Sequence, residues 1–267
     1  MKSKLLISSI TIFCTLFLLS GCGKEKTTNS ETNITKESQT SKKTTELSLS
    51  KALPKYKIWY LFETTEVIKD TKPSTIFYFN GEDVKEYKLT KPVLPDIIKI
   101  HNSIEQLTIS QIIDMDSQKQ LEYAKQQTDN SFKITHTIPN QGDINDLIDV
   151  EKEVSPPKKK AFTPYHLNII TDGSGNNTKE IELDTIINIL TLSSDYTDIY
   201  WQQVKDKLTF LSSYNQNIQI LNHNLNGFSL SKNQLLLTDT QDDTISFYLD
   251  DPKVNSTNIT VDSNVNK

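Results

Sequence analysis

The segment YHLNIITDGSGNNTKEIELD, residues 165–184, decides the fold class of this chain. Apolar and polar residues alternate over 165–169 and again over 180–184, and a period of two places successive side chains on opposite faces of a strand. The glycine- and asparagine-rich residues 172–177 between them are typical of a turn. The segment therefore predicts a β-hairpin with one apolar face and one solvated face.

Other parts of the chain show the same character. Residues 55–62 and 75–79 are rich in aromatic and β-branched side chains, and Asn80-Gly81 then predicts a second hairpin over 76–89. The cluster Trp59-Tyr60-Phe62 is interpreted as core strand, in preference to a ligand-stacking surface. Further strands are expected at 132–138, 218–220, 235–237 and 245–249.

Helices are expected only in the middle of the chain. The sequences SQKQ at 117–120 and TISQ at 108–111 each fit a capping box, in which a hydroxyl and a side-chain amide satisfy free backbone N–H groups. A 3.6-residue period over 95–107 suggests a further helical stretch. The predicted fold class is therefore mainly β (α+β): antiparallel sheets with a short helical insertion, following a disordered tether.

A polar segment divides the strands. Residues 140–163 contain acidic residues, then Pro156-Pro157 and three lysines at 158–160. Consecutive prolines fit neither a central strand nor a helix interior. We interpret 140–163 as a surface loop in one β-rich domain, residues 54–251, although an interdomain linker is the alternative. Residues 252–267 are predicted to be a polar C-terminal tail.

The N-terminus carries a separate signal. Two lysines precede an apolar run over 5–19, which ends in Leu19-Ser20-Gly21-Cys22. This pattern resembles the lipobox of bacterial lipoproteins, and beyond it the chain is similar to small lipoproteins of low-GC Gram-positive bacteria. The resemblance implies that residues 1–21 are a signal peptide and that Cys22 carries a lipid. A transmembrane helix is the weaker alternative, because fifteen residues span roughly 22 Å of a hydrocarbon core about 30 Å thick.

Composition narrows the range of partners. The chain has no arginine, and removal of residues 1–21 takes two of the 29 lysines, leaving 27 against 34 acidic residues and a formal charge of −7. An acidic chain without arginine is poorly suited to nucleic acid. Residues 22–53 lack large apolar clusters and are predicted to be a disordered, lipidated tether. The expected partners are the membrane, through the lipid, and a protein or a cell-wall polymer.

The candidates for chemistry are weak. Asp172, Ser174 and Asn176 have the oxygen spacing of a calcium loop, but the glycine expected at its sixth position is missing, so a hairpin turn is the better interpretation. No local metal-ligand spacing joins the histidines, and Cys22 is the only cysteine left after processing. The four histidines are His101, His136, His166 and His223.

Paired carboxylates give the only hint of catalysis. Glu180, Glu182 and Asp184 share one face of the predicted strand about 7 Å apart, but such a face is usually the solvated side of a hairpin. We therefore expect a non-enzymatic binding or accessory module on the extracytoplasmic face of the cell membrane, with no catalytic residues, metal or cofactor. The alternatives are a cell-wall or polymer-active enzyme that uses Glu180, Glu182 or a histidine, and a solute-binding protein.

Overall fold

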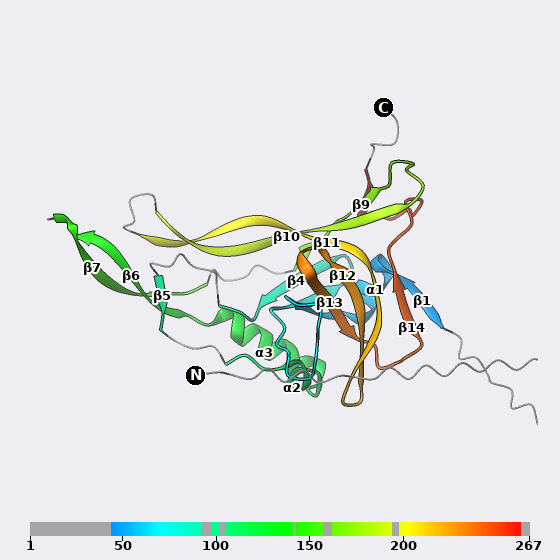
Figure 1. The fold of residues 1–267 in the computed structure, drawn as a ribbon, viewed down its shortest axis with the longest axis horizontal. Helices are drawn as coiled ribbons and strands as arrows, with labels where there is room; N and C mark the ends of the chain where they lie inside the picture. Colours follow the sequence, from blue (N-terminus) through cyan, green and yellow to red (C-terminus); the bar gives the residue numbers. More distant parts are fainter. Residues whose placement is uncertain are drawn as a thin grey trace, which may run out of the picture. The chain divides into compact units, whose positions relative to one another are not determined.

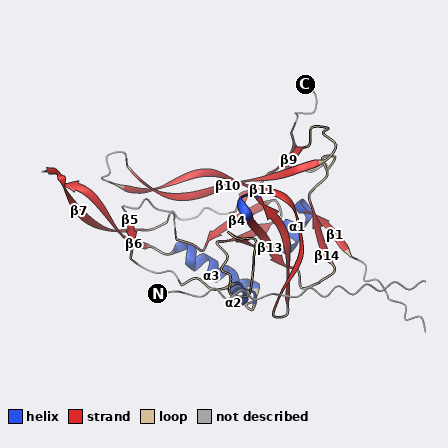
Figure 2. Ribbon diagram, viewed as in Figure 1, coloured by secondary structure: helices blue, strands red, loops and turns tan. Residues whose placement is uncertain are grey.

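A computed structural model of the chain describes residues 44–91, 98–101, 105–140, 143–156, 162–193 and 198–262. The fold is mainly β, as predicted, with few helices (Figure 2). The predicted signal peptide, Cys22 and most of the predicted tether lie outside the described residues. Within the described part, no helix is both long enough and apolar enough to cross a membrane.

Ten strands form the main sheet, in the spatial order β15-β9-β10-β11-β12-β13-β2-β3-β4-β8 (Figure 1). Neighbouring strands are antiparallel, except for the parallel pair β15 and β9. Their bounds are β2 (Ile58–Phe62), β3 (Thr75–Asn80), β4 (Asp83–Lys88), β8 (Thr163–Pro164), β9 (Leu167–Thr171), β10 (Thr178–Leu192), β11 (Ile199–Ile220), β12 (His223–Leu230), β13 (Gln234–Asp239) and β15 (Ile259–Val261). A short 3-10 turn, Ser231–Asn233, joins β12 to β13.

The sheet curls back on itself. Strands β8 and β9 lie at or next to its opposite ends, yet they are separated in sequence only by Tyr165 and His166. The backbone N–H of Tyr165 donates to the carbonyl of Glu82, immediately before β4, at 3.0 Å. One short segment therefore joins the two ends of the sheet and encloses its inner face.

Both predicted hairpins are confirmed. In the first, Leu167 lies opposite Leu183 and Ile169 opposite Ile181, and all four side chains are buried. In the second, β3 and β4 pair across a turn in which Gly81 has φ +66°, a conformation that favours glycine. Both turns were predictable because their signals are local in sequence.

The inner face of the curled sheet is filled by the N-terminal part of the domain. Helix α1 (Leu49–Tyr56) buries Leu49, Ala52 and Leu53 against the inner side chains of the sheet. Strand β1 (Thr45–Ser48) precedes it and pairs in parallel with β14 (Ile245–Tyr248). Folded structure therefore begins before residue 54, and the predicted tether boundary at 53 is wrong. The sequence did not indicate this, because the buried residues of α1 pack against strands that lie far along the chain.

The outer face is partly covered by helices α2 (Ile109–Ile113) and α3 (Ser117–Asp129). The predicted capping box at Thr108 is confirmed, with Gln111 as its partner. The other predicted box is displaced by one residue, because the Asp116 carboxylate caps α3 by accepting from the backbone N–H of Lys119 at 2.9 Å. The predicted helical period over 95–107 is wrong where it is described, since Ile98–Ile100 forms strand β5.

A smaller sheet consists of β5, β6 (Phe132–Asn140) and β7 (Asp143–Val154). It packs against the far end of β10 and β11 through an apolar cluster that includes Phe132 and Trp201. The prediction of a loop over 140–163 is therefore wrong for 143–154. An acidic, mostly solvated strand carries little apolar alternation, so backbone pairing with β6 decides it. The C-terminal tail is also not wholly irregular, because β15 pairs with β9 within predicted tail 252–267.

Candidate ligand-binding groove

A groove on the outer face arises because α3 covers one row of side chains and leaves the next row open. In the covered row, Tyr60 lies opposite Ile76, which lies opposite Tyr87. In the open row, Ile58 lies opposite Tyr78, which lies opposite Lys85. The open row comprises Ile58, Tyr78 and Lys85 and runs across β2, β3 and β4.

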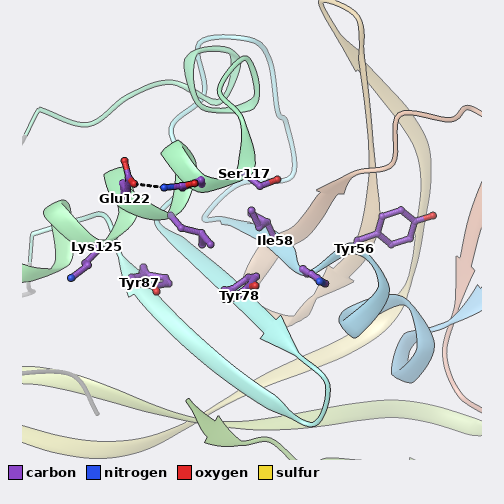
Figure 3. Close-up of a pocket in the computed structure, with 10 residues that line it drawn as sticks. Tyr56, Ile58, Tyr78, Tyr87, Ser117, Glu122 and Lys125 are labelled. Carbon is purple, nitrogen blue, oxygen red and sulfur yellow. Dashed lines mark hydrogen bonds between the residues drawn. The ribbon is translucent and has the colours of Figure 1, made fainter. Parts of the chain in front are cut away.

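Figure 3 shows the cavity beside this row. It has a volume of about 540 Å³ and is open to solvent. The strands contribute Ile58, Tyr78 and Tyr87, the end of α1 contributes Tyr56 and Lys57, and α3 contributes Ser117, Gln118, Leu121, Glu122 and Lys125. We call this cavity the tyrosine groove. The rings of Tyr78 and Tyr87 and two aliphatic side chains make its surface amphipathic, whereas the Tyr56 ring is turned away and packs against Trp59 and Phe247 of the inner core (Figure 3).

The helical wall of the tyrosine groove is held by buried hydrogen bonds. The Tyr60 hydroxyl donates to Gln120 Oε1 at 2.7 Å, and Gln120 Nε2 donates to the carbonyl of Met115 at 2.9 Å. Burial raises the pKa of Tyr60, the negative charge of Asp239 raises it further, and the bond to Gln120 opposes both effects. Tyr60 therefore remains a neutral donor, and it fixes α3 over the sheet.

Cationic side chains surround the tyrosine groove without being neutralised. Lys57 follows α1 with φ +61° and ψ −52°, and its carbonyl accepts from the backbone N–H of Phe79 at 2.8 Å. Lys57 and Lys125 form no hydrogen bond or ion pair through their side chains with any described residue. Lys85 Nζ lies 5.3 Å from the ring centroid of Tyr87. The one acidic residue of the lining, Glu122, accepts from Gln118 Nε2 at 2.9 Å.

A second, acidic cavity of about 560 Å³ continues the tyrosine groove and shares Tyr56, Ile58 and Ser117 with it. Its lining includes Asp114, Asp116 and Asp239 against Lys55, and although Asp116 is paired with Lys119 at 3.0 Å, the other two aspartates leave it more acidic than basic. In it, His223 Nδ1 lies 2.6 Å from Asp239 Oδ2, which fixes the orientation of the imidazole. The combined groove therefore has a basic end and an acidic end.

The sequence-predicted carboxylates lie elsewhere. Glu182 forms an ion pair with Lys207 at 2.5 Å, and it lies on the face of β10 opposite the buried Ile181 and Leu183. Asp184 lines a separate surface depression with lysines of β11. Glu180 does not line any of the cavities described in this structure. This arrangement fits the solvated face of a hairpin.

The predicted turn satisfies its own carboxylate. Asp172 accepts from the Ser174 hydroxyl at 2.6 Å and from Asn177 Nδ2 at 2.8 Å. These hydrogen bonds, from Ser174 first and then Asn177, lower the pKa of Asp172 to about 2. The interpretation of 172–177 as a turn is consistent with this geometry. Among the residues that the structure describes, no group of three or more His, Cys, Asp or Glu side chains could hold a metal ion.

The histidines are dispersed. His101 Nε2 lies 2.5 Å from Thr135 Oγ1, and His166 Nε2 lies 3.0 Å from Thr260 Oγ1. His136 belongs to β6, and its side chain lies outside the described part of the structure. Only His223 lines a cavity described here, and sequence spacing could not have identified it because its partner comes from the next strand.

The groove residues were missed from the sequence for the same reason. Tyr78 and Lys85 look like ordinary members of a hairpin, and Leu121 looks like a core position of a helix. Trp59 was correctly assigned to the core, where it is 0% exposed. The one available signal was that Tyr60 and Tyr78 place phenol groups on the outer face of adjacent strands. Comparisons with protein-family models, with curated proteins and with solved structures found no match to this chain.

Proposed function

We propose that this chain is a non-enzymatic binding module that is held on the extracytoplasmic face of the membrane by a lipid on Cys22. The observation that carries the binding role is the tyrosine groove: an open, amphipathic surface continuous with a polar cavity. Small-molecule sites usually enclose most of their ligand. An open groove with two chemically different ends suits a section of a longer chain, such as a cell-wall polymer.

The groove has the features that recognition requires and a rigid support. Tyrosine rings offer a large apolar area together with a polar hydroxyl, and they lose little conformational freedom on binding. The rows of the sheet fix Tyr78, and the buried bond between Tyr60 and Gln120 fixes the helical wall. A ligand would therefore meet a largely pre-formed surface.

Binding is tested with the purified full-length protein in detergent and isolated cell walls of the producing cells. Tyr78→Ala and Leu121→Ala each remove groove surface and should strongly reduce the amount of protein that the walls retain. Tyr248→Ala is the matched control, since Tyr248 is 43% exposed on β14 and does not line the groove. Equal retention of all four proteins would contradict the binding role of the groove.

Anchoring is tested independently. Cys22→Ser removes the sulfur that would carry the lipid, so the protein should be released from the membrane fraction or left unprocessed. Mass spectrometry of the native protein should find an acylated Cys22 at the N-terminus. An unmodified cysteine or a retained residue 1–21 segment would contradict this part of the proposal.

One observation favours the alternative of a polymer-active enzyme. A histidine oriented by a carboxylate, as His223 is by Asp239, is the arrangement that general acid–base catalysis uses. If the protein cleaved the polymer, His223→Gln would abolish the release of soluble fragments from walls while retention stayed intact. The binding proposal expects no fragments from either protein.

A further inference from the structure

We infer that the ligand of the tyrosine groove is a glycan chain that carries anionic groups, either phosphate or carboxylate. This inference rests on the proposed binding function and specifies its substrate class. It follows from the lysines that surround the groove, from the phenol rings between them, and from the acidic cavity at the other end.

Some lysines of the described fold are paired with carboxylates, and others are not. Lys119, Lys152 and Lys207 each form an ion pair with a neighbouring carboxylate. Lys57 and Lys125 have no such partner among the described residues, although both line one cavity. In a chain with an excess of acidic residues, two unpaired ammonium groups at one cavity are a surface complementary to an anion.

Lys85 adds a third positive charge to the same end. It lies opposite Tyr78 in the open row, and its Nζ contacts the face of Tyr87. The acidic residue of the lining, Glu122, accepts from the neutral amide of Gln118 and keeps its negative charge, so the lysines exceed it but do not stand alone. Lysine ammonium groups bind phosphate and carboxylate as point charges, and they tolerate the variable geometry of a flexible polymer.

The rings between these lysines identify the rest of the ligand. Tyr78 and Leu121, which are both only partly buried, provide apolar surfaces on which the C–H face of a sugar ring can pack, while the Tyr78 hydroxyl can bond to sugar hydroxyls. An inorganic anion would use the lysines alone and leave these surfaces empty. A glycan with charged substituents uses both.

The acidic cavity gives the ligand a direction. Asp114 and Asp239 would repel an anionic group placed there, whereas Asp116 is already paired with Lys119. The charged groups of the glycan therefore lie at the lysine end, and a neutral or amine-bearing part lies toward His223. The charge distribution thus fixes which section of the chain occupies which cavity.

The test compares three probes of equal length with the full-length protein: a neutral glucan heptamer, the same heptamer phosphorylated, and a galacturonic acid heptamer. Both charged heptamers, or one of them, should bind at least about tenfold more tightly than the neutral one, which corresponds to about 1.4 kcal/mol. The stronger of the two identifies phosphate or carboxylate as the anionic group. Binding should weaken as salt rises from about 0.05 to about 0.5 M.

Variants assign the effect to the groove. The triple variant Lys57→Gln, Lys85→Gln, Lys125→Gln should lose about tenfold in affinity for the charged heptamer. The matched control replaces three exposed lysines outside the groove, Lys179, Lys232 and Lys253, by glutamine and should bind normally. Lys125→Glu alone is the second test, and it should also weaken binding of the charged heptamer. The position is exposed on α3, so the substitution should not disturb the fold.

Three results would overturn the inference. The neutral heptamer could bind as tightly as the charged ones, the control triple variant could lose as much affinity as the groove variant, or no heptamer could bind. In each case, wall retention that depends on Tyr78 would still support the binding function with a different ligand. Loss of that dependence would overturn the binding function itself.

Discussion

Strand β2 places large apolar side chains on both faces of the sheet, and the two faces are covered to different extents. Trp59 and Leu61 point into the inner core, where α1 and β14 cover them completely. Ile58 and Tyr60 point to the outer face, where both are buried, but α3 leaves Tyr78 and Lys85, in the row of Ile58, partly exposed beside a groove. The inner face is thus a packed core, while the outer face is a packed core beside an open groove.

If the groove binds a ligand as proposed, this difference separates residues that stabilise the sheet from residues that recognise the ligand. The Trp59 ring packs beside Phe228 and Phe247, and its Nε1 donates to the carbonyl of Leu53 at 3.1 Å. Tyr78 contacts Phe162, packs against the edge of the outer-face cluster and remains half-buried. Replacing an inner aromatic residue should therefore change folding, and replacing an outer one should change binding.

The largest expected effect tests that division directly. Trp59→Ala should lower the free energy of unfolding by about 3–5 kcal/mol, because it leaves a cavity in a core without access to solvent. Tyr78→Ala should lower it by about 1 kcal/mol, since part of the ring is already solvated. Urea unfolding followed by circular dichroism measures both values. Similar losses for the two variants would break the comparison.

A second prediction concerns the packed part of the outer face. A Cβ at Gly227 would lie 1.9 Å from the carbonyl oxygen of Leu236, so Gly227→Ala must move β12 away from β13. We expect a loss of about 1–3 kcal/mol in the free energy of unfolding. Gly173→Ala is the control, because nothing lies within 4 Å of its added Cβ. If Gly227→Ala were as stable as the control, β12 and β13 would not be as tightly packed at this position as the structure shows.

Alkaline pH provides a third test. Burial, which Glu82 and Asp250 reinforce and a bond to Asn258 opposes, raises the pKa of Tyr165 to about 12. The folded state thus favours the protonated phenol, so its contribution to stability is complete below pH 10 and is lost as the pH rises toward about 12. The free energy of unfolding of Tyr165→Phe should depend less on pH in this window than that of the wild type. Urea titrations at several pH values measure it. Tyr248→Phe, on the surface, should leave the wild-type dependence unchanged.

The smallest expected effect sharpens the description of the groove. Asp114 is exposed in the acidic cavity, and Asp114→Asn removes one charge that repels an anionic ligand. The affinity for the charged heptamer should rise about twofold, the size of one exposed charge interaction. Asp70→Asn, an exposed residue outside the cavities, is the control. Decreased binding by Asp114→Asn would mean that the ligand enters in the opposite direction.

The local part of the fold was predictable from sequence. The two hairpins were found because Asn80-Gly81 and residues 172–177 carry turn chemistry next to alternating strands. Strand β1 and helix α1 were missed because only long-range packing makes them favourable: Leu49 and Leu53 are buried by strands much later in the chain. Strand β7 was not predicted, because its acidic residues leave little alternation between apolar and polar side chains.

The groove could not be predicted from the same information. Its floor depends on the register that places Ile58, Tyr78 and Lys85 in one row, and its wall depends on where α3 lies on the sheet. A shift of one residue in either pairing would turn these side chains to the other face. The residue types predicted strands and a helix, but they did not indicate which row of side chains the helix leaves uncovered.

The pairing of β1 with β14 also bears on export and assembly. Strand β1 pairs with β14, which follows it by 200 residues. At the same separation in sequence, the Ser50 hydroxyl donates to the Asp250 carboxylate at 2.5 Å. Contacts this distant in sequence close slowly, and they form only after almost the whole polypeptide has emerged. If the chain is exported N-terminus first, as proposed, β1 cannot pair with β14 until almost the whole chain has left the translocation pore.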